Sequence, residues 1–180
     1  MSKKLKKENN LYVILLRYIL IVIFGLGNLF IFYFIFTPLT IYPVYFILSN
    51  FYQVSLNGIS ILVNNFNNLF QIDLVEACIA GAAYYLLFML NLSTSMSIKK
   101  RIYSLSFAFF SLLVLNIIRI IILSFLFVNK IEYFDITHKL FWYAISTIFV
   151  VAIWFISIKL FSIKNIPVYS DFKEICKNLK

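Results

Sequence analysis

The chain has 180 residues, of which 63% are hydrophobic and only 13% are charged, and its mean hydropathy is +0.95. A soluble domain of this size cannot hide so much apolar surface, because a small domain leaves a large share of its surface exposed. The net charge of +9 would suggest a nucleic-acid partner in a soluble protein, but its distribution along this chain favours a membrane explanation. We therefore expect one integral membrane domain over 1–180 that binds no nucleic acid.

Four apolar runs are typical of membrane-spanning helices, which need roughly 18 or more apolar residues. The predicted spans are about 12–36, 74–92, 102–128 and 140–160. The first run contains Arg17, is longer than the apolar part of a signal peptide and has no small-residue cleavage site, so we expect a retained anchor. The predicted fold is an all-α membrane protein, a polytopic bundle of about four transmembrane helices.

Basic residues gather in three places that alternate with the predicted spans. They are the start of the chain ("MSKKLKKEN"), the "KKR" of 99–101, and the tail 161–180 with the adjoining Lys159. Basic segments flanking membrane helices stay in the cytoplasm. We therefore expect a multi-pass protein of the cell membrane with both termini in the cytoplasm.

The segments expected outside are 37–73 and 129–139. Pro38 and Pro43 interrupt an aromatic stretch, and a fifth crossing at 38–52 would reverse the charge pattern. We therefore favour an interfacial or re-entrant helix there, although the sequence leaves open whether 38–52 crosses the membrane. Asn57-Gly58 between short apolar alternations predicts a small outer β-hairpin over about 53–64.

Ionisable residues inside apolar runs are the informative ones, because a charge at the centre of a span costs about 2.5 to 3.5 kcal/mol on insertion scales. Glu76 and Cys78 lie at the outer end of the second predicted span, Arg119 lies within the third, and His138 begins the fourth. Asn116, three residues before Arg119, shares its helix face. The predicted topology brings these residues to the outer leaflet.

Each residue alone has an ordinary structural explanation. A lone cysteine in a membrane helix is usually a small apolar filler, a lone histidine at a helix start is usually interfacial, and Arg119 could pair with Glu76. Together, however, they supply a thiol nucleophile, a proton carrier and a fixed cation for a developing oxyanion. That combination is the chemistry of acyl transfer through a thioester.

Three ordered motifs resemble the exosortase/archaeosortase family of membrane transpeptidases. They are "VEACIAG" at 75–81, "LNIIRI" at 115–120 and "ITHKLFWY" at 136–143. The family carries an acidic-x-Cys box, an Asn-x-x-Arg-Ile box and a later His in this order. The chain is shorter than many members, and its compact form with an outer hairpin resembles an archaeosortase-like form. Its box reads Cys-Ile-Ala-Gly where Cys-Ser-Gly is common, a departure that concerns the substrate motif more than the chemistry.

The resemblance implies a cysteine-type membrane peptidase and transpeptidase. Its catalytic residues are Cys78 as the nucleophile, Arg119 as oxyanion stabiliser or proton donor, and His138 as the proton-handling group, with Glu76 and Asn116 in supporting positions. The implied partners are exported proteins whose C-terminal sorting signal combines a short motif, a transmembrane helix and a basic tail. A membrane lipid or another envelope component is the implied acceptor.

Two other functions remain open from the residues. A non-enzymatic small membrane protein, such as a transporter subunit or assembly factor, would use Arg119 and Glu76 as a structural ion pair. An acyltransferase or peptidase of another family would use the same thiol. One histidine with Cys78 and Cys176 far apart cannot form a zinc site, so we expect no metal and no cofactor.

Overall fold

A computed structural model describes residues 3–27, 29–65, 68–163, 167 and 169, with side chains from Tyr12 onward. Its helices are α1 (Lys3–Leu26), α2 (Phe30–Ser49), α3 (Glu76–Ile79), α4 (Gly81–Leu92), α5 (Ile98–Val128), α6 (Phe134–Leu140), the π-helix η1 (Phe141–Ile145) and α7 (Ser146–Leu160). Its strands are β1 (Gln53–Asn57), β2 (Ser60–Asn65) and β3 (Asn68–Asp73). The described chain is therefore mostly helical with one small sheet.

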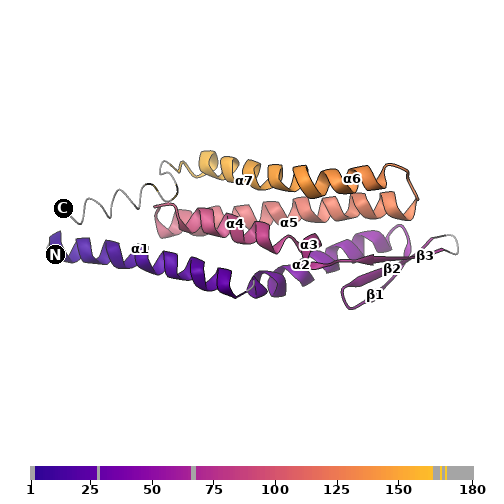
Figure 1. Cartoon of the computed structure of the whole chain (residues 1–180), viewed down its shortest axis with the longest axis horizontal. Coiled ribbons are helices and arrows are strands. Elements are labelled where there is room, and N and C mark those ends of the chain that lie inside the picture. Colours follow the sequence, from indigo (N-terminus) through magenta and orange to yellow (C-terminus); the bar gives the residue numbers. More distant parts are fainter. Residues whose placement is uncertain (1–2, 28, 66–67, 164–166, 168, 170–180) are drawn as a thin grey trace.

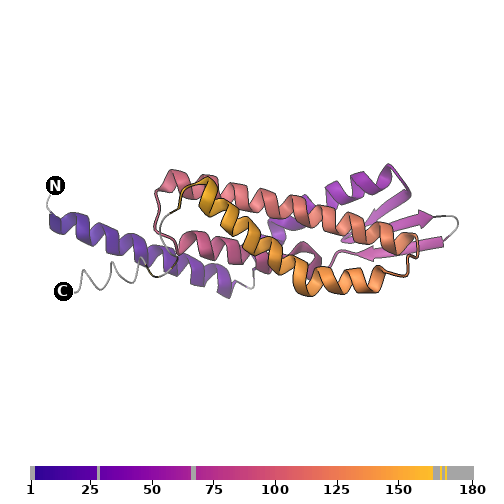
Figure 2. The same cartoon turned by 90° about the horizontal axis from the view of Figure 1, so that it is seen from above.

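The helices form an elongated bundle with the sheet at one end (Figure 1). The start of α1, the connection from α4 to α5 and the end of α7 lie toward the other end of the molecule (Figures 1 and 2). Helices α1 and α2 follow one another along the bundle, so the chain reaches the sheet end in two helical segments. The predicted helix bundle is thus confirmed in outline.

The first predicted span has the wrong bounds. Instead of one helix over 12–36, α1 ends at Leu26 and α2 begins at Phe30, after Leu29 takes a left-handed φ of 58°. The predicted interfacial segment 38–52 is mostly the second half of α2, which continues through Pro38 and Pro43 to Ser49. Prolines are tolerated in apolar helices where local adjustments satisfy the freed backbone groups.

The predicted hairpin is confirmed but incomplete. Strands β1 and β2 pair antiparallel around a two-residue turn whose first residue, Gly58, has a φ of 62°, as such tight turns require. A third strand, β3, pairs antiparallel with β2 and places Ile72 opposite Ile61. The sequence predicts no third strand, because the residues before Leu69 are mostly asparagine. Ile61 and Val63 of β2 are fully buried against the helices.

The other three predicted spans also change in detail. The second is broken at Ala80, whose φ of 62° separates α3 from α4. The third begins earlier, at Ile98. The fourth extends from α6 through η1 into α7, and Figure 2 shows the chain changing direction there; a π-turn is one of the recognised causes of a helix bend. Most of the predicted tail, 161–180, lies outside the described residues.

Helix α5 has the polarity of a membrane helix. Its buried face repeats every four residues and contains Ser104, Asn116 and Arg119, whereas Phe110 and Ile102 are 68% and 58% exposed. Polar groups turned inward and large apolar groups turned outward suit a bundle surrounded by hydrocarbon rather than water. The pattern indicates a membrane protein.

Three helical segments are long and apolar enough to cross a membrane: Phe30–Ser49, Ile98–Val128 and Phe134–Leu160. Two shorter apolar segments, Tyr12–Leu26 and Gly81–Leu92, lie beside them in the chain. Length and composition thus support three spans among the described residues, not the four predicted.

Two arginines hold the end of α4 that lies away from the sheet. Arg17 of α1 donates from Nη1 to the carbonyl oxygens of Leu92 and Thr94, at 3.2 and 3.3 Å. Arg101 of α5 donates to the same two carbonyls and to that of Asn91, each at 3.0 Å. The last carbonyls of a helix have no partner within it, so these bonds join α1, α4 and α5 at one level.

Candidate functional site

The site is built around the break between α3 and α4. Because Ala80 turns left-handed, the last carbonyls of α3 have no partner in a continuing helix. Asn116 of α5 donates its side-chain amide to the carbonyl oxygen of Cys78 at 2.8 Å and to that of Ile79 at 3.4 Å. Asn116 is only 3% exposed. Its role in this geometry is to fix the backbone that carries Cys78.

Arg119 binds the same carbonyl from the next turn of α5. Its Nη2 donates to the carbonyl oxygen of Cys78 at 3.1 Å, and its Nη1 donates to the hydroxyl of Ser146 at 2.8 Å. The Ser146 hydroxyl in turn donates to the carbonyl oxygen of Phe141, at 2.6 Å, across the π-helix. A single guanidinium therefore ties α5 to α3 and to the bend before α7.

A cleft of about 270 Å³ opens beside this arginine. Cys78, Arg119 and His138 all line it, although they come from three different helices. Its floor and walls are otherwise largely apolar, and one wall is the end of β3. The apolar residues of this lining are Ile72, Leu74, Val75, Ile120, Leu123, Phe127, Phe134, Phe141 and Trp142. The three predicted catalytic residues thus face one cavity.

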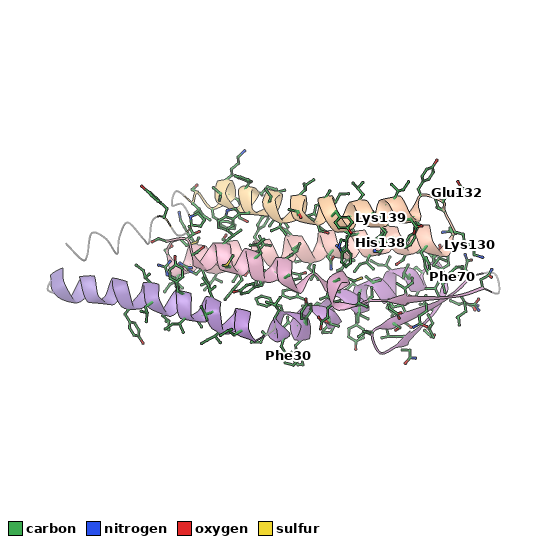
Figure 3. All side chains as sticks on the ribbon, in the orientation of Figure 1. Phe30, Phe70, Lys130, Glu132, His138 and Lys139 are labelled. Atoms are coloured by element: carbon green, nitrogen blue, oxygen red, sulfur yellow. The ribbon has the colours of Figure 1, made fainter. Side chains whose placement is uncertain are left out.

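His138 lines the cleft from α6, with its ring among aromatic side chains. Its ring stacks on Phe134, with centroids 5.6 Å apart, and meets the edge of Trp142 at 6.2 Å. No hydrogen bond joins His138 to Cys78 or Arg119, all of which belong to the described part of the chain. Figure 3 shows His138 beside Lys139 on α6, away from Lys130, Glu132 and Phe70 at the far end of the bundle.

Glu76 does not line the cleft that contains Cys78 and His138. It precedes Cys78 by two positions on α3, so the two side chains leave the helix on different faces. Glu76 is exposed and lines a second hollow of about 190 Å³ with Tyr33 and Gly81. A Cβ on Gly81 would stand 2.5 Å from Cε1 of Tyr33, so the small residue there admits the ring. The structure does not bring Glu76 to the thiol.

Arg119 reaches the second hollow as well as the cleft. It is 8% exposed, and its Nε is buried with no hydrogen-bond partner in the described structure. Arg119 and Glu76, both within the described range, form no ion pair, so the structural pair considered from the sequence is not present. A nearly buried cation without a carboxylate is costly unless a polar group offsets it, and here the offset comes from oxygens of Cys78 and Ser146.

The rim of the cleft holds one carboxylate, Asp73 at the end of β3. The hydroxyl of Ser60 donates to its Oδ1 at 2.6 Å and the amide of Gln71 donates to the same atom at 2.8 Å. These two bonds hold the pKa of the Asp73 carboxyl below its usual value. Asp73 therefore fastens β2 to β3 beside the cleft.

The arrangement provides a thiol, an imidazole and a fixed cation around one cavity of mostly apolar lining. Such a cavity strengthens electrostatic interactions and limits competing water. Among the residues that the structure describes, no group of three or more His, Cys, Asp or Glu side chains could hold a metal ion. The chemistry available to these side chains is nucleophilic and acid–base in kind.

Sequence reasoning missed Ser146 and the wall formed by β3. Ser146 carries no motif of its own, and only its position two helical turns after His138 on the same helical run could have placed it near Arg119. The wall of β3 could have been found from the alternation of the apolar Phe70 and Ile72 with the polar Gln71 and Asp73. Comparisons with protein-family models, with curated proteins and with solved structures find no match.

Proposed function

We propose that this chain is a membrane-embedded cysteine transpeptidase. It cleaves C-terminal sorting signals from exported surface proteins through an acyl-thioester and transfers the new carboxyl end to a lipid or another envelope acceptor. The observation that carries the proposal is the cleft lined jointly by Cys78, Arg119 and His138. Thiol, imidazole and guanidinium are the three groups that this reaction needs, and they come from separate helices of the bundle.

The first half-reaction breaks one peptide bond. The Sγ of Cys78 attacks the scissile carbonyl carbon while its proton passes to the imidazole of His138. The guanidinium of Arg119 stabilises the oxyanion that develops. His138 then donates the proton to the leaving nitrogen, the C–N bond breaks, and the cleaved helix leaves as an amine. The substrate's new C-terminus remains bound to Cys78 as a thioester.

The second half-reaction restores the thiol. A hydroxyl or amine of the acceptor attacks the thioester carbonyl, its proton passes to His138, and the C–S bond breaks with the proton returned to Cys78. Arg119 stabilises the second oxyanion from the same position. The apolar walls of the cleft favour this transfer over hydrolysis, because they limit access of water.

The depth of Arg119 suits a signal cut at the membrane surface. Arg101 and Arg119 lie on one helix, 18 residues apart, which is about 27 Å at 1.5 Å per residue. The hydrocarbon core of a bilayer is about 30 Å thick. With the "KKR" that ends at Arg101 at the cytoplasmic boundary, Arg119 lies near the outer boundary, where the sheet and α6 cover the cleft. If the shorter apolar helix α4 crosses with its preceding α3 as a fourth segment, the chain has both termini in the cytoplasm.

The substrate and acceptor classes come from the three motifs that resemble the exosortase/archaeosortase family. A sorting signal places its cleavage motif just above its own transmembrane helix, at the depth proposed for Cys78. The exposed apolar flanks of the bundle let such a helix approach from the lipid. Proposed function and proposed topology therefore agree on where the bond is cut.

Co-expression in membranes tests the proposal. Tagged exported proteins that end in a short motif, an apolar helix and a basic tail are expressed with the chain, and their shortening is followed by gel mobility and mass spectrometry. We expect shortening with the native chain and with Cys176→Ala, and none with Cys78→Ala. Equal maturation with Cys78→Ala, in cells holding no other enzyme of this kind, would exclude the proposal.

A non-enzymatic role has one observation in its favour. The hydrogen bonds of Arg119 reach the backbone of α3 and Ser146, as expected of a residue that holds helices together. In that case Cys78→Ala is silent in every assay, while Arg119→Ala destabilises the chain. Measuring insertion and thermal stability of both variants beside their cleavage activity separates the two functions.

A further inference from the structure

Strand β3 forms one edge of the sheet, whose order is β1-β2-β3. The backbone N–H of Leu74 donates to the carbonyl oxygen of Ile59 at 3.1 Å, which fixes the phase of the pairing between β3 and β2. In an antiparallel ladder, residues that bond the neighbouring strand alternate with residues that do not. The backbone N–H and C=O groups of Leu69, Gln71 and Asp73 therefore point away from β2, to the open edge.

The open edge of β3 lies along the cleft. Ile72 belongs to the face of the sheet that packs inward, opposite the buried Ile61, whereas Gln71 and Asp73 belong to the exposed face. All three β3 residues line the cleft together with Cys78. Because consecutive residues from both faces of β3 line one cavity, we place this cavity at the edge of the last part of the strand. The unpaired backbone groups and the thiol thus share one cavity.

We propose that the edge of β3 binds the cleavage motif of the substrate as an added, fourth strand. The occupant is an extended polypeptide segment, held by backbone hydrogen bonds to Gln71 and Asp73 and led past Val75 to the thiol of Cys78. This inference rests on the proposed function and names how the same site recognises its substrate. Strand addition is an established way for a sheet edge to bind peptides.

The backbone pattern favours a polypeptide over a lipid or a small molecule. Unpaired N–H and C=O groups that alternate along an edge match the backbone of another extended chain. Side chains of the added strand point alternately to the two sides of the sheet. One side meets the apolar walls from Leu123 and Phe127, and the other meets the polar face with Gln71 and Asp73. We expect a motif in which apolar and polar residues alternate.

Disulfide capture at Cys78 tests this without any acyl transfer. The full chain carrying Cys176→Ser is incubated in detergent with a pool of short peptides, each with one central cysteine. The concentration of reductant is then raised stepwise. Intact mass reports which peptides stay bound to Cys78. We expect retention of peptides with alternating apolar residues. N-methylation of their backbone should reduce retention at every second position only, because alternate N–H groups bond the edge.

Proline variants test the edge itself. Gln71→Pro removes an outward N–H but no bond of the ladder, a position where edge strands tolerate proline. Retention should fall roughly fivefold, the equivalent of one lost hydrogen bond. Gln71→Ala controls for the lost side chain, and Leu56→Pro is the matched change at the outward position of β1, the opposite edge. Leu56→Pro should not lower retention, and Gln71→Ala should lower it less than Gln71→Pro does, because it keeps the outward N–H.

The outcomes distinguish between possible occupants of the β3 edge. If retention depends on apolar content but not on the position of N-methyl groups, or if Gln71→Pro behaves as Leu56→Pro does, strand addition is wrong. Failure of every peptide to bond Cys78 also overturns it. If the native chain self-associates and Gln71→Pro abolishes this, a second copy occupies the edge instead. If the chain captures peptides but cleaves no substrate, the proposed function is wrong and peptide binding at the edge of β3 still holds.

Discussion

Arginines bind backbone carbonyls at both ends of α4. At one end, Arg17 and Arg101 bind the carbonyls that follow the last turn of α4. At the other end, Arg119 binds the carbonyl of Cys78 at the break between α3 and α4. In both places an arginine supplies the hydrogen bonds that a helix end lacks.

The two ends differ in the residues that surround the arginines. The cleft that Arg119 lines also contains Cys78 and His138, whereas the bonds of Arg17 and Arg101 join helices around backbone carbonyls. A buried arginine therefore does not mark a functional site by itself. It marks a candidate site where it lines a cavity together with a thiol and an imidazole.

The largest expected difference between the ends is in the rate of substrate cleavage after each arginine is replaced by lysine. Lysine keeps the charge but loses the planar fork that binds two partners at once. Arg119→Lys should lower cleavage of a sorting-signal substrate by roughly 100-fold, because oxyanion stabilisation is lost. Arg101→Lys is the matched control and should leave cleavage per folded molecule nearly unchanged. Equal losses in the two variants would mean that both arginines only hold the fold.

His138 and Lys139 offer a similar pair within one helix. Both are exposed on α6, but only His138 lines the cleft. His138→Ala should lower the rate of cleavage by roughly 100-fold through loss of proton transfer, while Lys139→Ala should change it little. The rates are measured at matched amounts of inserted protein. An active His138→Ala would remove this residue from the mechanism.

Alanine variants of Asn116 and Ser124 extend the comparison to the free energy of unfolding. Asn116→Ala leaves the carbonyl of Ile79 without its partner and should cost about 1 to 3 kcal/mol. Ser124 is equally buried, but its hydroxyl donates within its own helix, to Ile120, so Ser124→Ala should cost less than about 1 kcal/mol. Thermal unfolding in detergent measures both. A silent Asn116→Ala would show that the α3 break needs no support from α5.

The smallest expected effect is a pH dependence of the stability of the sheet. The pKa of Asp73 is lower in the folded chain than in an unfolded one, because Ser60 and Gln71 donate to its carboxylate. Its contribution is therefore complete above the ordinary carboxyl pKa of about 4 and is lost as the pH falls through the lowered value. Hydrogen exchange over 60–73 should speed up in that range, and Asp73→Asn should remove the dependence.

The helical architecture and the meeting of three residues were predictable, because both follow from local patterns. Long apolar runs predict membrane helices, and the spacing of Asn116 and Arg119 places them on one face. The predicted order of the motifs along the chain then brings Cys78 and His138 to the same end. These inferences need only helix geometry and an antiparallel arrangement.

The breaks and the third strand were not predictable, because they depend on partners far along the chain. Leu29 and Ala80 take left-handed φ values that residues with a Cβ rarely adopt, so nothing in their identity marks a helix end. Strand β3 forms by pairing with β2. Ser146 accepts a hydrogen bond from Arg119 at a position that follows the π-helix η1. Glu76 shares a motif with Cys78 but leaves the helix on another face.

The measurement that tests the central claim most directly is the capture of the acyl-enzyme. The full chain is incubated in membranes with a sorting-signal substrate, quenched with acid, and digested to locate any adduct that hydroxylamine releases. The account predicts a substrate thioester on Cys78 that is absent from Cys78→Ala and present in Cys176→Ala. A substrate that is cleaved normally while no adduct forms on Cys78, or while Cys78→Ala is in place, would contradict it.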